Sequence, residues 1–121
     1  MNVLSIGGSD TSSGAGIQSD IKTFENHGAY GFTVITAITS QNTKKISEIL
    51  PIPSKVIKSQ LKSILDDFSI DAIKIGMVYD SGIIKTIHKI IKKTKCPVVV
   101  DPIIKSTTGT ILLKKSAMND F

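Results

Sequence analysis

The 121-residue chain is long enough for one domain or part of a larger one, and its 40% hydrophobic share is sufficient for a core. No apolar run approaches the ~20 residues of a membrane span, and one cysteine, Cys96, excludes an internal disulfide framework, so we expect a cytoplasmic protein that does not cross a membrane. The net charge of +5 comes from lysines spread along helix-like segments with few aromatic residues, which favours solvated helix faces over a nucleic-acid surface.

The apolar residues change period repeatedly along the chain, which predicts strands alternating with helices. Runs of β-branched residues predict the strands, and apolar residues three and four apart predict the helices. In chain order we expect a buried strand at 3–6, a helix from about 13 to 27, a strand at 32–39, a short strand returning along a sheet edge at 46–50, a helix from 53–54 to 65, a strand at 70–75, a helix at 83–91, a buried strand at 96–100, and the start of a helix at 112–121.

This alternation predicts an α/β protein with a mainly parallel sheet and right-handed crossovers. About four parallel strands are fewer than a doubly wound sheet usually has, so we expect residues 1–121 to be the N-terminal part of something longer. Ligands of parallel sheets bind outside the carboxyl ends of the strands. We therefore expect a small-molecule site where four segments meet: residues 7–16, 39–42, 74–77 and 101–109.

The first of these segments is rich in glycine and leads into a predicted helix. Glycines let a backbone approach a ligand closely, and a helix N-terminus offers free N–H groups. The segment lacks the Gly-Lys-Ser/Thr ending of a phosphate-binding P-loop and the third glycine of a dinucleotide fingerprint. A turn with Asp10, Ser12 or Ser13 as the helix cap is the alternative interpretation.

Four further side chains are candidates for binding or catalysis. Asp20 borders the apolar stripe of the predicted helix, where a carboxylate is costly unless it is paired or accepts hydrogen bonds from a ligand. Gln41 follows a strand, and its amide suits an amino-substituted heterocycle, although a polar turn is the more common use. Met77 offers a thioether to a flat ring or ordinary core filling. Asp101 ends a hydrophobic strand, where a carboxylate suits magnesium or phosphate.

These residues lie in motifs that resemble the hydroxymethylpyrimidine and phosphomethylpyrimidine kinase family of thiamine biosynthesis. The resemblance covers nearly the whole chain, and its most specific stretch is Ser13-Gly14-Ala15-Gly16-Ile17-Gln18-Ser19-Asp20. It extends to residues 6–10, 28–31, 34–37, 41–43, 73–77 and 100–102. It implies a ribokinase-like fold with helices on both faces of the sheet, a homodimer, and transfer of the γ-phosphoryl of ATP, with Mg²⁺, to 4-amino-5-hydroxymethyl-2-methylpyrimidine and then to its monophosphate.

The resemblance also implies a role for individual residues. Lys74 would be structural or would lie behind the substrate contacts. Asp101 would face the nucleotide phosphates and the metal. The pyrimidine would be held by Gly8, Asp20, Gln41 and Met77, with Ile103 packed near it.

Two departures from the family pattern are visible. Thr107 occupies the position of a frequent family lysine, and Lys105 is the nearest lysine. The family's anion hole, its catalytic residue and most of its ATP pocket correspond to sequence beyond this chain, so we expect no catalytic residue within it and no activity from it alone. A pyridoxal kinase of the same fold and a non-catalytic pyrimidine-sensing module are the alternatives.

Overall fold

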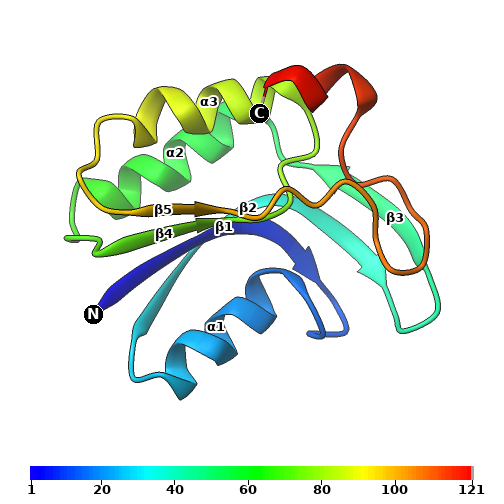
Figure 1. Ribbon diagram of the computed structural model, residues 1–121, viewed down its shortest axis with the longest axis horizontal. Helices are drawn as coiled ribbons and strands as arrows, with labels where there is room; N and C mark the ends of the chain where they lie inside the picture. Colours follow the sequence, from blue (N-terminus) through cyan, green and yellow to red (C-terminus); the bar gives the residue numbers. More distant parts are fainter. Residues whose placement is uncertain (121) are drawn as a thin grey trace.

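Five strands form one sheet in the order β3-β2-β1-β4-β5 in the computed structural model, which describes residues 1–120 (Figure 1). The strands are β1 (Asn2–Asp10), β2 (Tyr30–Gln41), β3 (Ile46–Pro51), β4 (Ala72–Ile75) and β5 (Val98–Val100). The helices are α1 (Gly16–Asn26), α2 (Ser54–Leu65), α3 (Ser81–Ile91) and the short 3₁₀ helix η1 (Lys115–Asp120).

The sheet is mainly parallel, as the alternating pattern predicts. β1 pairs in parallel with both β2 and β4, and β5 pairs in parallel with β4. β3 runs antiparallel along the edge of β2, which confirms the predicted returning strand. Figure 1 shows α1 on one face of the sheet and α2 and α3 on the other, so helices cover both faces.

The core lies around β1, the central strand. Leu4 and Ile6 of β1 are fully buried and belong to one apolar cluster with Ile57 and Leu61 of α2 and Ile83 of α3. A parallel strand with neighbours on both sides and helices on both faces has no solvent-facing side, so its sequence reads as a continuous apolar run. Among residues 1–120, the helices are all too short or too polar to cross a bilayer.

The start of the chain differs from the prediction in two respects. β1 continues through the glycines to Asp10, and its register against β2 shifts between Gly7 and Gly8. Helix α1 begins later than expected, with Ala15 as its N-cap and no side-chain capping bond. The alternative interpretation, in which Asp10, Ser12 or Ser13 is the helix cap, was therefore wrong, because the residues before the helix form a loop in which Ser13 has a positive φ of 59°.

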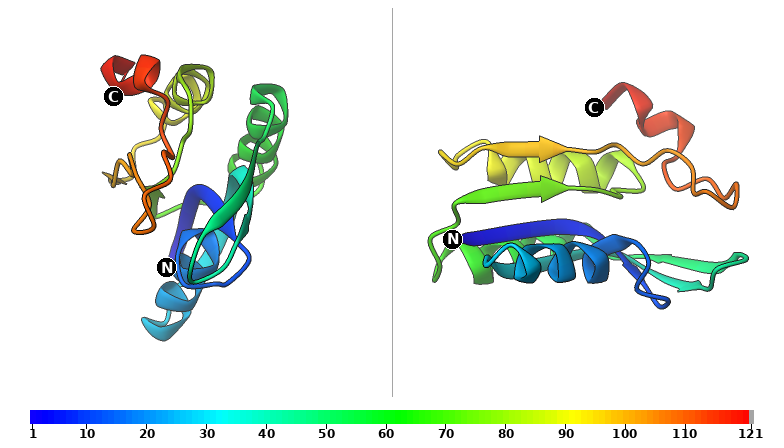
Figure 2. Two further views of the ribbon diagram at one scale, coloured as in Figure 1. Left: turned by 90° about the vertical axis from the view of Figure 1, so that its right-hand side faces the viewer. Right: turned by 60° about the horizontal axis from the view of Figure 1, so that its bottom comes forward.

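The last third of the chain also differs. β5 was predicted to be buried, but Val99 is 63% exposed because β5 is the sheet edge, beyond β4 (Figure 2). Leu112 and Leu113 are extended rather than helical, and Leu113 forms an isolated parallel bridge with Tyr79. Only η1, packed near α3, is helical in this region, and residue 121 lies outside the described residues.

Candidate substrate-binding site

The four segments expected at the carboxyl edge of the sheet line one cavity. Its volume is about 250 Å³, and its walls come from residues 7–10 with 15–16, from Thr39 and Gln41, from 74–77 and from 103–107. Small-molecule pockets are roughly 300–1,000 Å³, so this cavity matches a single small ring better than a nucleotide. Gly8, Asp20, Gln41, Met77 and Ile103 all line it, whereas Asp101 is exposed at the end of β5 and does not.

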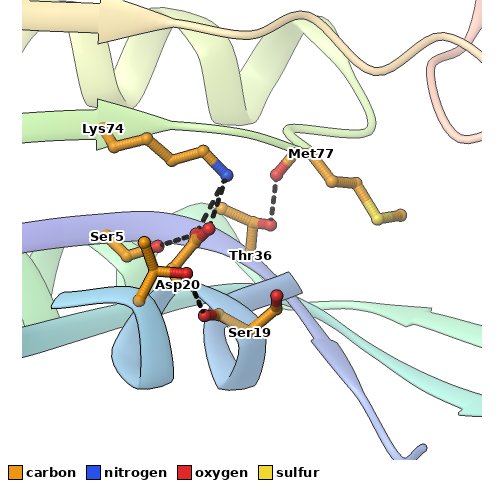
Figure 3. Close-up of polar contacts among 7 residues, drawn as sticks. Ser5, Ser19, Asp20, Thr36, Lys74 and Met77 are labelled. Carbon is orange, nitrogen blue, oxygen red and sulfur yellow. Dashed lines mark hydrogen bonds and ion pairs between the residues drawn. The ribbon is translucent and has the colours of Figure 1, made fainter. Parts of the chain in front are cut away.

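Gly8 and Met77 form the floor of the cavity. A Cβ on Gly8 would lie 2.8 Å from the sulfur of Met77, so the thioether lies against the backbone of β1 only because Gly8 has no side chain. The carbonyl of Met77 accepts a 2.6 Å hydrogen bond from the buried hydroxyl of Thr36 in β2 (Figure 3). The segment after β4 is thereby attached to β2, the strand on the other side of β1 in the same sheet.

The glycine-rich loop is organised by Asp10. Its carboxylate accepts hydrogen bonds from the amide and hydroxyl of Ser12, both 2.8 Å, and from the amide of Ala15 at 2.9 Å. Burial raises the pKa of Asp10, but the bonds from Ser12, Ala15 and Gly14 together outweigh this effect and hold its pKa below the ordinary value. Asp10 therefore takes over the stabilising role that a side-chain helix cap would have.

Gln18 attaches helix α1 to the end of β1. Its side-chain oxygen accepts a 2.9 Å hydrogen bond from the amide of Asp10, and its Nε2 donates a 2.7 Å bond to the hydroxyl of Ser9. Gly16 has a φ of +62°, and a Cβ there would collide with the carbonyl oxygen of Gly8. Helix and strand therefore approach each other more closely than any other residue at position 16 would allow.

Asp20 points from α1 toward the sheet beneath it. One of its oxygens accepts a 2.6 Å hydrogen bond from the hydroxyl of Ser5, and the Nζ of Lys74 lies 2.9 and 3.1 Å from its two oxygens (Figure 3). Sequence reasoning placed Asp20 in the site and expected Lys74 to be structural or to lie behind the substrate contacts. The structure shows that Lys74 also lines the cavity.

Gln41 is held at the end of β2 through its main chain. The Gln41 carbonyl accepts a 2.6 Å hydrogen bond from the hydroxyl of Thr11. The Gln41 N–H donates a 2.9 Å hydrogen bond to the oxygen of that Thr11 hydroxyl. The side-chain oxygen accepts a longer contact, 3.2 Å, from Thr39. The strand end is therefore fixed to the glycine-rich loop, while the amide side chain borders the cavity.

The remaining wall is a loop after β5. Ile103, Lys105 and Thr107 all line the cavity, so the two positions considered for the family's lysine lie at the same place. The loop is closed by hydrogen bonds from the amide of Ser106 to the carbonyl of Thr110, 2.9 Å, and from the amide of Gly109 back to Ser106, 3.0 Å. Within residues 1–120, no group of three or more His, Cys, Asp or Glu side chains is arranged to hold a metal ion.

Sequence reasoning missed three residues that organise the site: Ser5, Gln18 and Thr36. Ser5 and Thr36 are fully buried polar residues within otherwise apolar strands. A hydroxyl in an apolar run needs a hydrogen-bond partner, and that was the available signal. The partners themselves, Asp20 and the carbonyl of Met77, lie far away in sequence and could not be identified from it.

Comparison with known proteins gives consistent relatives. The family described as phosphomethylpyrimidine kinase matches residues 10–121. The chain is 43% identical over 119 residues to the hydroxymethylpyrimidine/phosphomethylpyrimidine kinase of Aquifex aeolicus, a match that covers 98% of this chain and 47% of that protein. A crystal structure of phosphomethylpyrimidine kinase from Clostridium difficile matches with a TM-score of 0.91 and 45% identity, over 99% of this chain and 52% of that one.

Pyridoxal kinase is a second kind of structural relative. The enzyme of Staphylococcus aureus in complex with pyridoxal matches with a TM-score of 0.77 and 39% identity, over 85% of this chain and 38% of that one. The same enzyme has been solved with ADP and with AMP-PCP. The chain thus spans about half the length of the two phosphomethylpyrimidine kinases and 38% of the pyridoxal kinase.

Proposed function

Because this chain belongs to the phosphomethylpyrimidine kinase family, we propose that its cavity binds 4-amino-5-hydroxymethyl-2-methylpyrimidine and its monophosphate as the substrate-binding part of an ATP-dependent kinase of thiamine biosynthesis. The observation that carries this proposal is the meeting of Gly8, Asp20, Gln41, Met77 and Ile103 around one cavity of about 250 Å³.

Each of these residues has a physical role in the proposal. Met77 and Ile103 supply apolar surface for the faces of a flat ring, with Gly8 leaving the space that Met77 occupies. The Gln41 amide both donates and accepts, which suits a ring nitrogen beside an amino group. The Asp20 carboxylate accepts from the amino or hydroxymethyl group.

Asp101 is the residue that we propose to face the nucleotide phosphates and the metal. Mg²⁺ is usually bound by one or two carboxylates together with substrate phosphates. The exposed Asp101 fits such a shared role, and a metal site made of protein groups alone does not fit the residues described in 1–120. ATP would supply the phosphoryl group, as the ADP and AMP-PCP complexes of the Staphylococcus aureus relative support.

The rest of the assignment follows the family. We propose that residues 1–121 form the N-terminal part of a single ribokinase-like domain in a cytoplasmic homodimer, and that phosphoryl transfer needs elements beyond those in this chain. Pyridoxal kinase is the second candidate, because a pyridoxal-bound relative has the same fold and 39% identity. Both candidate substrates are flat heterocycles that carry a hydroxymethyl group.

Calorimetric titration of the 121-residue chain with the aminopyrimidine and, separately, with pyridoxal distinguishes the two candidates. We expect the aminopyrimidine to bind at least tenfold more tightly than pyridoxal. Gln41→Ala should weaken aminopyrimidine binding by about 2- to 12-fold, as the loss of a neutral hydrogen bond implies. Asn42→Ala, next in sequence and outside the cavity walls, serves as the control. Tighter binding of pyridoxal would replace the first candidate by the second, and binding of neither ring would contradict the proposal.

A further inference from the structure

The closest group of charged and polar side chains beside the cavity comes from three different elements. Ser5 lies on β1, Asp20 on α1 and Lys74 on β4, and the carboxylate of Asp20 is bonded to both of the others at 2.6 to 3.1 Å (Figure 3). The side chains of Lys74 and Asp20 are 25% and 18% exposed, so their ion pair is largely withdrawn from water.

The backbone explains why these three side chains meet. Ser5 and Lys74 are register partners in the parallel pair of β1 and β4, so both side chains stand on the same face of the sheet. Helix α1 covers that face and brings Asp20 over them. Gly76 is two residues from Lys74 on the same face, and a Cβ there would lie 3.0 Å from the ammonium nitrogen, so the glycine leaves the room that the lysine uses.

The hydrogen bonds to the Asp20 carboxylate leave one of its acceptor positions open to a ligand. A carboxylate offers about four acceptor positions, and Ser5 and Lys74 together occupy three of them. Because Lys74 contacts both oxygens, it fixes the orientation of the carboxylate plane. Because Asp20 lines the cavity, its remaining acceptor position is available to a ligand there.

We infer that Lys74 is a positioning residue for substrate recognition: it acts through Asp20, whose carboxylate it orients to accept a hydrogen bond from the amino group of the ring. This inference rests on the proposed function. It assigns Lys74 a specific part in ligand selectivity, whereas the sequence led us to expect only a residue that is structural or lies behind the substrate contacts.

A double-mutant cycle tests whether Lys74 acts through Asp20. The aminopyrimidine is titrated calorimetrically into the wild-type chain, Lys74→Met, Asp20→Asn and the double variant. We expect Lys74→Met and Asp20→Asn each to weaken binding by about 10- to 150-fold, the range for a lost hydrogen bond to a charged group. In the Asp20→Asn background, Lys74→Met should change the affinity by less than about twofold, because its partner is already gone. Lys55→Met, an exposed lysine on the opposite face of the sheet, is the matched control.

A second ligand separates selectivity from general loss of structure. Wild type should bind the aminopyrimidine more tightly than 5-hydroxymethyl-2-methylpyrimidine, which lacks the amino group. Lys74→Met should bring the two affinities together, whereas a merely structural defect would weaken both ligands equally. If thermal melts show that Lys74→Met is unfolded, Lys74→Gln, which keeps a polar side chain and removes the ammonium group, is put through the same cycle with Asp20→Asn.

The possible failures are distinguishable. Additive effects of the two substitutions, in a wild type that binds the aminopyrimidine, would overturn the positioning role of Lys74 and leave the proposed function intact. A wild type that binds pyridoxal and not the aminopyrimidine would overturn the positioning role as stated, because pyridoxal has no amino group for Asp20 to accept from. A wild type that binds neither ring would overturn both proposals.

Discussion

Thr36 and Met77, which are 41 positions apart in sequence, are joined by a buried 2.6 Å hydrogen bond from the Thr36 hydroxyl to the Met77 carbonyl. This bond ties the strand that ends in Gln41 to the segment that carries the thioether of the cavity. The position of Met77 in the cavity wall therefore depends on a hydrogen bond from Thr36, a residue that does not itself line the cavity.

Replacing this threonine tests the connection. Thr36→Val keeps the side-chain volume but leaves the buried carbonyl of Met77 without its partner, so we expect a loss of roughly 1–3 kcal/mol in the free energy of unfolding. Urea denaturation measures it. Thr33→Val, on the same strand and partly exposed, should stay within about 0.5 kcal/mol. Equal losses in both variants would show that the bond contributes nothing specific.

Gly16 and Gly28 are a matched pair: comparing them separates the cost of a steric clash with neighbouring backbone from the cost of backbone strain at positive φ. Both have a positive φ, +62° and +70°, but a Cβ on Gly16 would strike the carbonyl of Gly8, whereas a Cβ on Gly28 has open space. We expect Gly28→Ala to cost about 1 kcal/mol from strain alone and Gly16→Ala clearly more. Thermal and urea unfolding of the two variants gives the comparison, and a cost for Gly16→Ala no greater than for Gly28→Ala would refute the steric argument.

Asp10 should make stability depend on acid pH. Its hydrogen bonds hold its folded-state pKa below the ordinary 3.8, so its stabilising contribution is complete above that value and is lost as pH falls through the lower, folded-state value. Asp10→Asn should therefore be less stable than wild type at pH 6, and the gap should narrow toward pH 3. Urea unfolding across this range measures the gap. Asp67→Asn, an exposed carboxylate after α2, is the control; a gap for Asp10→Asn that does not change with pH would contradict the prediction.

The exposed edge strand β5 should promote self-association of the 121-residue chain. Val99 is 63% exposed on a strand with an unpaired edge, and such edges recruit further strands. Val99→Lys should lower the concentration-dependent association measured by sedimentation velocity, while changing the free energy of unfolding by less than about 0.5 kcal/mol. Val56→Lys, at an exposed valine of α2, should not lower it. Unchanged association in Val99→Lys would exclude β5 as the contact.

The prediction of the fold succeeded where burial shapes the local sequence. Runs such as residues 32–39 and 70–75 are apolar and β-branched because helices cover both faces of the sheet, so their strands could be located to within two residues at either end. The region after residue 100 was predicted less well. Leu112 and Leu113 are buried by extended contacts, and an apolar pair followed by a short polar stretch does not distinguish this from the start of a helix.

The site shows the same division. The edge of the sheet at which the site lies could be predicted from the order of strands and helices along the chain. Motif positions indicated Gly8, Gln41 and Met77, which do line the cavity. Their roles stay predictions until ligand binding is measured. The ion pair of Asp20 with Lys74 could not be predicted, because it joins residues 54 positions apart whose meeting depends on the register of two strands.

The central place of β1 has a consequence for how the molecule folds. The neighbours of β1 come from residues 30–39 on one side and 72–75 on the other, so the first strand to be made gains its second neighbour only after residue 75 has been made. Parallel pairings between distant segments are slow to form, because the intervening loop must close before the contact stabilises anything. The cavity therefore has no precursor in any short piece of the chain: ligand-binding competence should arise in the same kinetic phase as burial of β1, and during synthesis only after the wall residues from Ile103 to Leu112 have been made.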